Sequence, residues 1–531
     1  MISIVSSTLL QHYRNFSVVM KHFGSSIFFY LLRLRVGVLY FAAAVSVSAC
    51  GGGGEVLPAI ANRVTGVNAQ PGVTPFISSV KLSGQDLESV TTIRYTIARK
   101  PGSVSKPVKV QYSIGALKQR GYTTPIGNSI TLPVFGLYAG YLNHVVIELS
   151  FVDTSTQILA IDIATASYSD PNQIYDKPTI LQGRAPAATL GFDFIYLKSQ
   201  FGTPIVVDTD AQIRWVGPNI GYVSSASQAF IGSSFFIGDS SSKSFTRLEL
   251  DGVTHPLQIL SSTVTAFHHN IGPGKVGLIA EVNTGSSGIE STAIEIDKSG
   301  KVLSQWDLAA LLSSYMRSQG DDPALFVRPG VDWFHMNSTV YDQRDDSLIV
   351  SSRENFVIKI DYKTGSIKWI FGDPTKHWYT FPSLRAKALQ LDSGGLYPIG
   401  QHALSINSAG QLELFNDGEG SLNQPAGASP GGSRTYSVVS AYTIDPIAKM
   451  AHEAWRFDYG QKIFSAVCSS AYEAGGKTLL VDYAYADGGT HSRLVGLDTG
   501  HNVVFDFQYS STYCGTSWNA QPIRLENLII Q

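Results

Sequence analysis

Three histidines recur at one interval in this chain of 531 residues. His268 and His335 both stand in the pattern Phe-His-x-Asn, and His402 follows a glycine and a glutamine. His335 lies 67 positions after His268, and His402 lies 67 positions after His335. Because each histidine precedes a stretch rich in β-forming residues, we expect the three to occupy equivalent points of successive repeats and to converge on one pocket.

Imidazoles grouped in this way suit two kinds of chemistry. Neutral imidazole is a nucleophile near pH 7, so one histidine could carry a transferred group in a covalent intermediate. Three histidines with an open position could instead hold zinc. Arg353, between His335 and His402, offers a planar and permanently charged fork for two oxygens of an anion, or else forms a structural salt bridge. The residue types leave both kinds of site open.

A recurring hairpin predicts the elements that must position these histidines. Each copy has an apolar strand, an aspartate, a tight turn and a second strand that ends on an aromatic or aliphatic residue. Six copies follow one another, at 204–215, 248–257, 293–306, 357–369, 441–455 and 494–505. At roughly 57 residues per copy, they suit four-stranded blades stacked around an axis. We therefore predict a six-bladed β-propeller over 176–531; the alternative is a large sandwich whose hairpins are alike by coincidence.

A separate domain is expected before the propeller. Residues 75–175 alternate short apolar runs with turns of Gly, Pro and Ser, which predicts a small N-terminal β-sandwich. The segment 169–172, Ser-Asp-Pro-Asn, breaks this pattern and marks the boundary. Charged residues make up only 15% of the chain, and residues that favour strands and turns are plentiful, so the predicted fold class is all-β.

The first 50 residues are typical of an export leader. Arg33 and Arg35 precede an apolar run over 36–47, and a Val-Ser-Ala-Cys tetrapeptide follows at 47–50. This tetrapeptide resembles the cleavage box of bacterial lipoproteins, so Cys50 is the expected lipidation site and 51–74 a flexible tether. The expected location is the periplasmic side of the outer membrane. A plain signal peptide or an N-terminal anchor helix is the alternative.

Composition narrows the remaining possibilities. A net charge of −2 without a dense basic block argues against nucleic acid as a partner. No segment after residue 50 reaches the roughly 18 apolar residues of a membrane-spanning helix. Neither Cys468 nor Cys514 stands in the Cys-x-Pro-x-Arg sequence of sulfatases, and whether these two cysteines pair is left open.

One part of the chain resembles a known family. The residues that carry the resemblance are the segments 332–338 (Asp-Trp-Phe-His-Met-Asn-Ser), 345–353, 358–361, 368–372, 400–402 (Gly-Gln-His), 415–418 (Phe-Asn-Asp-Gly), 433–434 and 441–445. They resemble the bacterial arylsulfotransferases that need no phosphoadenosine cofactor. The resemblance is specific over 332–418 and looser over the rest of 75–531.

The resemblance implies an aryl-sulfate sulfotransferase that moves a sulfuryl group from an aryl sulfate to a phenol in a ping-pong cycle, with neither a metal nor a diffusible cofactor. It implies that His402 is the nucleophile and that His335 and Arg353 surround the sulfuryl group. A histidine of the pair His268 and His269 completes the family's site, and the shared Phe-His-x-Asn pattern favours His268.

Further contacts are expected from the same resemblance. Asn337, Ser338 and His269 are expected to bind substrate, and either His335 or His268 to take the proton of the acceptor phenol. A homodimer is also implied. The family's short cysteine-bridged loop before the nucleophile is absent here, since residues 393–395 contain no cysteine. A non-enzymatic propeller that binds a ligand or partner is the alternative class.

Overall fold

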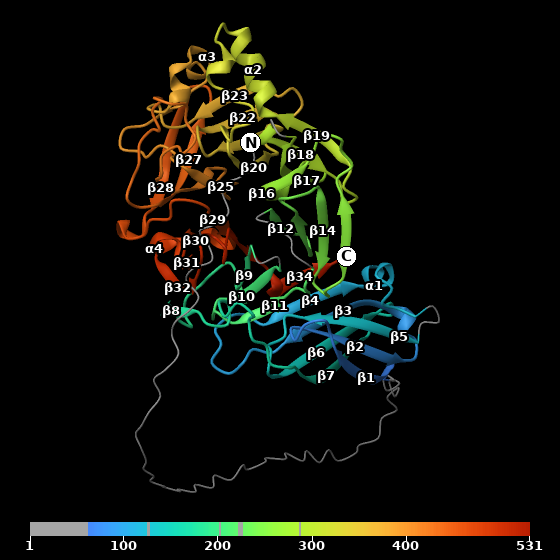
Figure 1. The fold of residues 1–531 in the computed structure, drawn as a ribbon. Helices are drawn as coiled ribbons and strands as arrows, with labels where there is room; N and C mark the ends of the chain where they lie inside the picture. The colour runs from blue at the N-terminus through green and yellow to red at the C-terminus, as the bar shows by residue number, and fades with distance from the viewer. Residues whose placement is uncertain (1–61, 125–127, 201–202, 221–226, 286–287) are drawn as a thin grey trace, which may run out of the picture. The chain divides into compact units, whose positions relative to one another are not determined.

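The computed structural model describes residues 62–124, 128–200, 203–220, 227–285 and 288–531. The predicted leader, its lipidation site Cys50 and the first part of the predicted tether lie outside the described residues. Strands supply most of the regular structure that is described, which confirms the all-β prediction (Figure 1). The described α-helices are α1 (Ile114–Gln119), α2 (Leu308–Ser318), α3 (Pro382–Arg385) and α4 (Ala486–Gly489). None of the helices in the described ranges has the length and apolar character needed to cross a membrane.

Two sheets built largely from the early strands share one hydrophobic core. The first contains β1 (Val64–Pro71), β2 (Ile77–Gly84) and β5 (Ser129–Phe135). The second, in the order β34-β4-β3-β6-β7, contains β3 (Val90–Ile97), β4 (Val108–Ser113), β6 (Leu142–Phe151), β7 (Thr156–Ala164) and β34 (Leu528–Ile530). Alternate residues of these strands, among them Val80, Leu132, Ile93 and Ile147, are fully buried in the shared core.

Strand β1 lies inside the segment 51–74 that the sequence predicts to be a tether. Val64 is buried in the core, and Val67 and Ala69 pack against its edge. Their alternation is the signal of a half-buried strand, but the neighbouring Pro71 and Gly72 resemble a linker. Ordered structure therefore begins before residue 75.

The later strands form five further sheets. The first, in the order β11-β10-β9-β33, contains β9 (Phe194–Leu197), β10 (Ile205–Asp208), β11 (Ile213–Val216) and β33 (Ala520–Ile523). An eight-stranded sheet contains β12 (Gln228–Ile231), β13 (Ser234–Gly238), β14 (Ser244–Glu249), β15 (Thr254–Gln258), β16 (Ala266–Pro273), β17 (Leu278–Thr284), β18 (Gly288–Ile296) and β19 (Val302–Asp307). Its two sets of four strands join through the parallel pair β12 and β16, where Gln228 lies opposite Asn270.

The other three sheets continue this pattern of consecutive antiparallel strands. The third contains β20 (Met336–Asp342), β21 (Ser347–Ser352), β22 (Val357–Asp361) and β23 (Ile367–Phe371). The fourth contains β25 (Gln401–Ile406), β26 (Leu412–Asn416), β27 (Val438–Asp445) and β28 (Met450–Phe457), with the short β24 (Gln390–Leu391) beside β28. The fifth contains β29 (Ser470–Ala474), β30 (Thr478–Tyr485), β31 (His491–Leu497), β32 (Val503–Ser510) and, at its edge, β8 (Thr179–Gln182).

All six predicted hairpins are confirmed. They are the antiparallel pairs β10–β11, β14–β15, β18–β19, β22–β23, β27–β28 and β31–β32. The recurring aspartate accepts backbone N–H bonds within each turn; Asp297, for example, accepts from Ser299 and Lys301. A carboxylate that satisfies turn amides in this way stabilises the reversal of the chain, which explains why the residue recurs.

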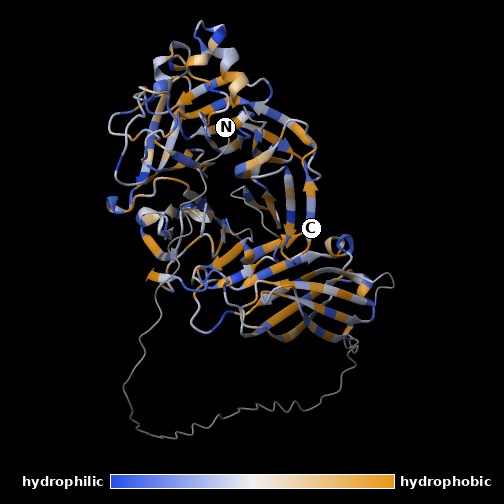
Figure 2. Ribbon diagram, in the orientation of Figure 1, coloured by the Kyte–Doolittle hydropathy of each residue, from blue (hydrophilic) through white to orange (hydrophobic). Residues whose placement is uncertain are grey.

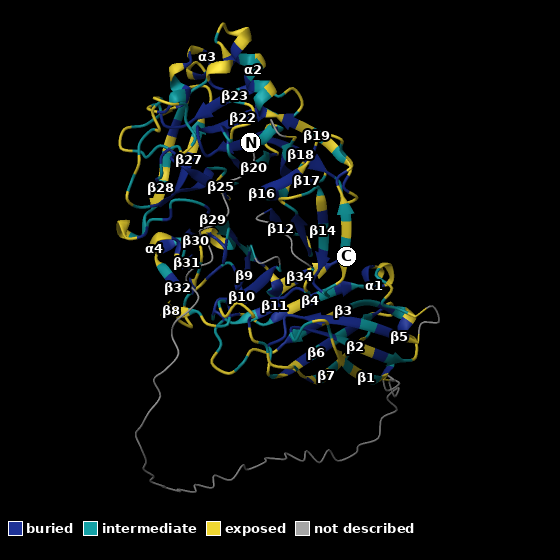
Figure 3. Cartoon of the chain, viewed as in Figure 1, coloured by how far each residue is buried: buried dark blue, intermediate teal, exposed yellow. Residues whose placement is uncertain are grey.

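The first strands of successive sets contact one another in the order β12, β16, β20, β25 and β29, and β29 contacts β33. Hydrophobic residues pack between neighbouring sheets, as where Val357 of β22 and Leu414 of β26 share a core (Figure 2). These first strands are largely buried, whereas β7 and β28 alternate with exposed positions (Figure 3). Segments that carry His269, His335 and His402 are thereby brought together.

Candidate active site

His402 lies on β25 with its side chain almost fully buried. Its Nδ1 atom is 2.9 Å from a carboxylate oxygen of Asp417 and 3.0 Å from the carbonyl oxygen of Gly400. Both neighbours are acceptors, so Nδ1 carries the proton and Nε2 keeps its lone pair. Burial raises the pKa of Asp417, while the adjacent His402 opposes that rise.

His335 stands immediately before β20 and is flanked by two carboxylates. Its Nδ1 atom is 2.5 Å from Asp332 Oδ2 and 3.1 Å from Glu290 Oε2. Burial acts against the charged imidazole, but Glu290 and Asp332 outweigh it, and the pKa of His335 is raised. Burial also raises the pKa of Glu290, to about 7. The two carboxylates therefore favour the protonated form of His335.

The two adjacent histidines of β16 have different surroundings. The ring of His269 is 4.7 Å from that of His335, and its Nδ1 is 3.6 Å from Glu290 Oε2. Burial and then the charges of His335, His268, His402 and Arg353 lower its pKa. His268 lies behind it, with Nδ1 3.3 Å from His269 Nδ1, and burial lowers the pKa of His268 to about 3. The geometry thus favours His269 over His268, contrary to the preference drawn from the sequence pattern.

The backbone takes the left-handed conformation at three residues at or next to these histidines, one near the start of each of β16, β20 and β25. The φ angles are 45° at His269, 50° at His335 and 50° at Ala403, and non-glycine residues rarely adopt them. The ladder shifts register beside each: between His268 and Ile271 in β16, and likewise at the start of β20 and of β25. Equal spacing in sequence therefore does not place the three predicted histidines at identical backbone positions.

Arg353 directly follows β21 and its side chain is 1% exposed. Its guanidinium donates to Glu354 Oε1 at 3.0 Å and to the carbonyl oxygen of Ala466 at 3.3 Å, while Nε has no hydrogen-bond partner among the described residues. A side chain added at Gly400, where φ is +61°, would approach Arg353 Nη2 at 3.6 Å. The cation is thus held beside the segment that carries His402.

Asn337 and Ser338, both expected to bind substrate, have partners within the protein. The amide of Asn337 donates to Gln401 O at 2.9 Å, and the hydroxyl of Ser338 accepts from Leu404 N–H at 2.8 Å. These bonds tie β20 to β25. The amide oxygen Oδ1 of Asn337 has no hydrogen-bond partner in the described ranges.

Cys468 and Cys514, left open by the sequence, form a disulfide. Trp518 packs against it, and the ring of Trp518 lies 5.5 Å from that of His269. Ala466, two residues before Cys468, is the carbonyl that accepts from Arg353. The disulfide therefore links the loop that holds Arg353 to the segment that packs against His269.

Three carboxylates of the site were not among the predicted site residues. Asp332 and Asp417 lie inside the segments that carry the family resemblance, close to a histidine motif. Their positions could therefore have identified them as candidate site residues. Glu290 enters from β18, another strand of the sheet that contains His269, and nothing in its sequence context indicates a partner 45 residues away.

Two groups of side chains have the spacing of a metal site. The ligand atoms of His269, Glu290 and His335 lie within 4.8 Å of one another, as do those of His268, His269 and Glu281. Two histidines and a carboxylate can hold a divalent transition metal. His268 Nε2, Glu281 Oε1 and Glu290 Oε2 have no hydrogen-bond partner among the described residues.

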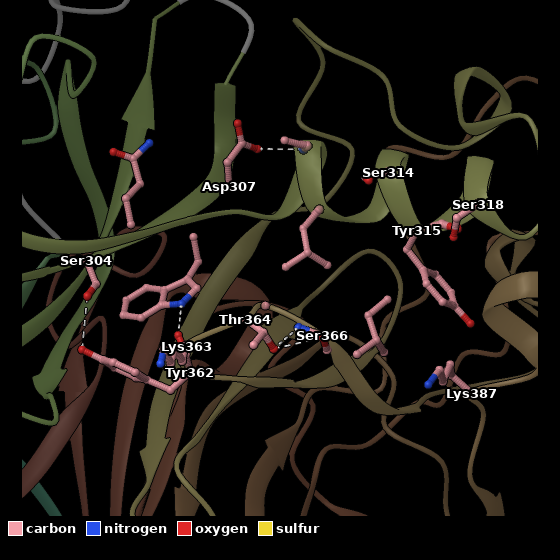
Figure 4. A pocket seen from close by; sticks show the side chains of 16 residues that line it. Ser304, Asp307, Ser314, Tyr315, Ser318, Tyr362, Lys363, Thr364, Ser366 and Lys387 are labelled. Carbon is pink, nitrogen blue, oxygen red and sulfur yellow. Dashed lines mark hydrogen bonds between the residues drawn. The ribbon is translucent and has the colours of Figure 1, made fainter.

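A separate groove of about 870 Å³ lies beside α2 and contains none of the predicted site residues. Trp306 donates its indole N–H to Tyr362 O at 2.9 Å, and the hydroxyls of Ser304 and Tyr362 are 3.3 Å apart (Figure 4). The groove lining contains neither histidine nor cysteine, and its only cations are Lys363 and Lys387. The histidines expected at the site lie instead on or directly before β16, β20 and β25.

The site combines a histidine paired with a carboxylate, a second histidine and a buried arginine. These groups suit a protein that transfers a group from an anionic substrate. The chain belongs to the arylsulfotransferase (ASST) family, whose model matches residues 183–519.

Individual relatives match over shorter stretches. The chain is 29% identical over 238 residues to the arylsulfate sulfotransferase AssT of Escherichia coli O6:H1, which is 36% of this chain and 39% of that protein. It is 28% identical over 229 residues to AssT of Lelliottia amnigena, or 34% and 37% of the two chains. The chain thus covers less than two fifths of either relative's length. The β-propeller domain of Cps50 (Swd1) from Myceliophteria thermophila gives a TM-score of 0.35 at 11% identity, covering 63% of this chain and 100% of that domain.

Proposed function

We propose that this protein transfers a sulfuryl group from an aryl sulfate to a phenol through a covalent intermediate on His402. The observation that carries the proposal is the pairing of His402 with Asp417 beside the buried Arg353. The name of the matched relatives, arylsulfate sulfotransferase, supports the same reaction.

In the first half of the reaction, His402 Nε2 attacks the sulfur atom. The Nε2–S bond forms as the S–O bond to the aryl group breaks, and the bonding electrons leave on the aryl oxygen. Asp417 stabilises the positive charge that develops on the imidazole ring, and the cationic Arg353 stabilises the sulfuryl oxygens. Neither residue has to gain or lose a proton during the step.

His335 is assigned the proton transfers. Its raised pKa keeps it protonated, so it can donate a proton to the departing aryl oxygen. In the second half the oxygen of the acceptor phenol attacks sulfur, the S–Nε2 bond breaks with its electrons returning to His402, and the phenol proton passes to His335. His269 is held neutral by its lowered pKa and is assigned hydrogen bonding to the sulfuryl group, in place of His268.

We also propose that the five later sheets are six blades of a propeller, with the eight-stranded sheet counted as two. The succession of contacts between their first strands supports this interpretation. The two early sheets with their shared core are proposed to be an N-terminal sandwich. Lipidation at Cys50, a periplasmic location and a homodimer complete the proposal as expectations from the sequence.

The direct test is the intact mass of the protein after brief mixing with 4-nitrophenyl sulfate. We expect a gain of about 80 Da, the mass of SO₃, which a phenol then removes. A folded protein that releases no nitrophenol and gains no mass would contradict the proposal.

A metal-dependent reaction is the second candidate, because His269, Glu290 and His335 have the spacing of metal ligands. Dialysis against a strong chelator, with metal content measured before and after, distinguishes the two. Sulfuryl transfer on His402 should survive chelation at full rate, whereas a loss restored by zinc would favour the metal.

The pH dependence of turnover should report the carboxylates around His335. Because the pKa of His335 is raised, its acid form persists above the usual range, and kcat for phenyl sulfate should fall as pH rises through that pKa. Glu290→Gln removes an anion that raises the pKa of His335, so this alkaline limb should move to lower pH.

The control for this profile is Glu148→Gln, on an exposed position of β6, which should leave the limb in place. The donor 4-nitrophenyl sulfate, whose leaving group needs less protonation, should show a shallower limb. An unmoved limb in Glu290→Gln would remove His335 from the role of acid.

A further inference from the structure

A buried lysine lies next to the proposed site but has no part in the proposed reaction. Lys198 follows β9 and is 1% exposed. Its Nζ atom donates to Asn270 Oδ1 at 3.1 Å. Its backbone N–H donates to Asn519 O at 3.0 Å, and its carbonyl accepts from Trp518 N–H at 2.9 Å.

Two of the partners of Lys198, Asn270 and Trp518, are neighbours of His269. Asn270 is the next residue along the chain, inside the register shift of β16, and its own N–H donates to Glu281 Oε2 at 3.2 Å. Trp518 packs its ring 5.5 Å from the ring of His269. Lys198 therefore joins a residue adjacent to His269 in the chain to a residue that contacts the ring of His269.

Burial of the Lys198 ammonium group does not by itself stabilise the fold. An ammonium group loses its hydration on burial, and recovers the loss only with close partners. Glu281 is fully buried nearby, and its negative charge favours the ammonium form of Lys198. Burial lowers the pKa of Lys198 to about 7, an effect that Glu281 partly offsets.

The strained backbone gives Lys198 a role. His269 has a φ of 45°, a conformation that costs free energy in a residue with a side chain and persists only where the surroundings hold it. We propose that Lys198 is a positioning residue. Its side chain binds Asn270 and its backbone carbonyl accepts from Trp518, and together these contacts hold His269 in this conformation against His335. This inference rests on the proposed sulfuryl transfer, in which His269 contacts the sulfuryl group.

The test is a double-mutant cycle on sulfuryl transfer. Lys198→Met and Asn270→Ala should each lower kcat about 10- to 100-fold with little change in KM, and the double variant should be no slower than the slower single variant. Lys198→Gln keeps an N–H donor and should recover part of the loss. Multiplicative losses in the double variant would overturn the proposal.

A matched control separates positioning from folding. Lys359 of β22 is also buried and pairs with Asp342 at 2.7 Å and with Asp345 at 2.8 Å, neither of which is assigned a part in the proposed reaction. Lys359→Met should lower the thermal midpoint but leave kcat unchanged. If Lys198→Met loses activity only in proportion to a lowered thermal midpoint, the positioning role is wrong.

A readout without turnover keeps this inference distinct from the proposed function. In spectra of protein with ¹⁵N-labelled histidine, the signal that His269→Ala removes should shift in Lys198→Met and stay in place in Lys359→Met. An unshifted signal would overturn the positioning role. Absence of the 80 Da adduct from the wild-type protein would instead contradict the proposed function.

Discussion

Replacing His402 by alanine should abolish sulfuryl transfer, with a loss of about 10⁴-fold or more in turnover of 4-nitrophenyl sulfate. The reason is that the proposed intermediate is a covalent bond to Nε2 of His402. Arg353 and the other histidines are assigned other roles, so none of them replaces the missing nucleophile. Intact mass after mixing with the donor is the measurement. The wild-type protein should gain about 80 Da, and the variant should keep its original mass.

A suitable control is His144→Ala, because that exposed histidine of β6 pairs with Asp162 and has no part in the proposed reaction. It should form the adduct at the wild-type rate. Circular dichroism and the thermal midpoint should show that His402→Ala is folded. An adduct that persists in folded His402→Ala would place the intermediate on another residue.

Replacing Asp417 by asparagine should lower kcat about 100-fold or more while KM changes little. A carboxylate oxygen of Asp417 lies 2.9 Å from Nδ1 of His402, and its negative charge favours a proton on that nitrogen, which leaves Nε2 free to attack. An amide can donate to Nδ1 instead, and this favours the tautomer whose proton blocks Nε2. The asparagine also cannot stabilise the imidazolium that forms during attack. Stopped-flow measurement of nitrophenol release gives the rate of this half-reaction.

The matched variant is Asp193→Asn. Asp193 is also fully buried, and it pairs with Arg184 at 2.7 Å and Lys106 at 3.0 Å just before β9. Its loss should lower the thermal midpoint and leave nitrophenol release unchanged. Release in Asp417→Asn within about threefold of wild type would mean that the carboxylate does not orient His402.

The repeating part of the fold was accessible to sequence reasoning because its signals are local. Each hairpin joins an alternating strand to a turn whose aspartate accepts hydrogen bonds from backbone N–H groups. Both features lie within about 15 residues of one another. The motifs around His335, Arg353 and His402 were joined into one expected site by the equal spacing of the histidines and by the family resemblance. Strand β1 was missed because a proline and a glycine flank an otherwise ordinary alternation.

The site itself was predictable only in part, because it depends on backbone register. Extra residues are inserted into β16 between His268 and Ile271, so a constant interval in sequence selects His268 where the fold presents His269. Glu290 comes from another strand, β18, and no local pattern marks it. The pairing of Cys468 with Cys514 similarly depends on where two distant loops meet in space.

The described strands also cross-link early and late parts of the chain in both directions. The late strand β33 completes the sheet of β9, the early strand β8 completes the sheet of β32, and β34 lies parallel to β4. During synthesis, β9 therefore waits for a partner that emerges more than 300 residues later. The first and last of the later sheets are expected to become stable together and late. Shortened versions lacking 520–531 should leave β9 without its partner β33 and β4 without its partner β34.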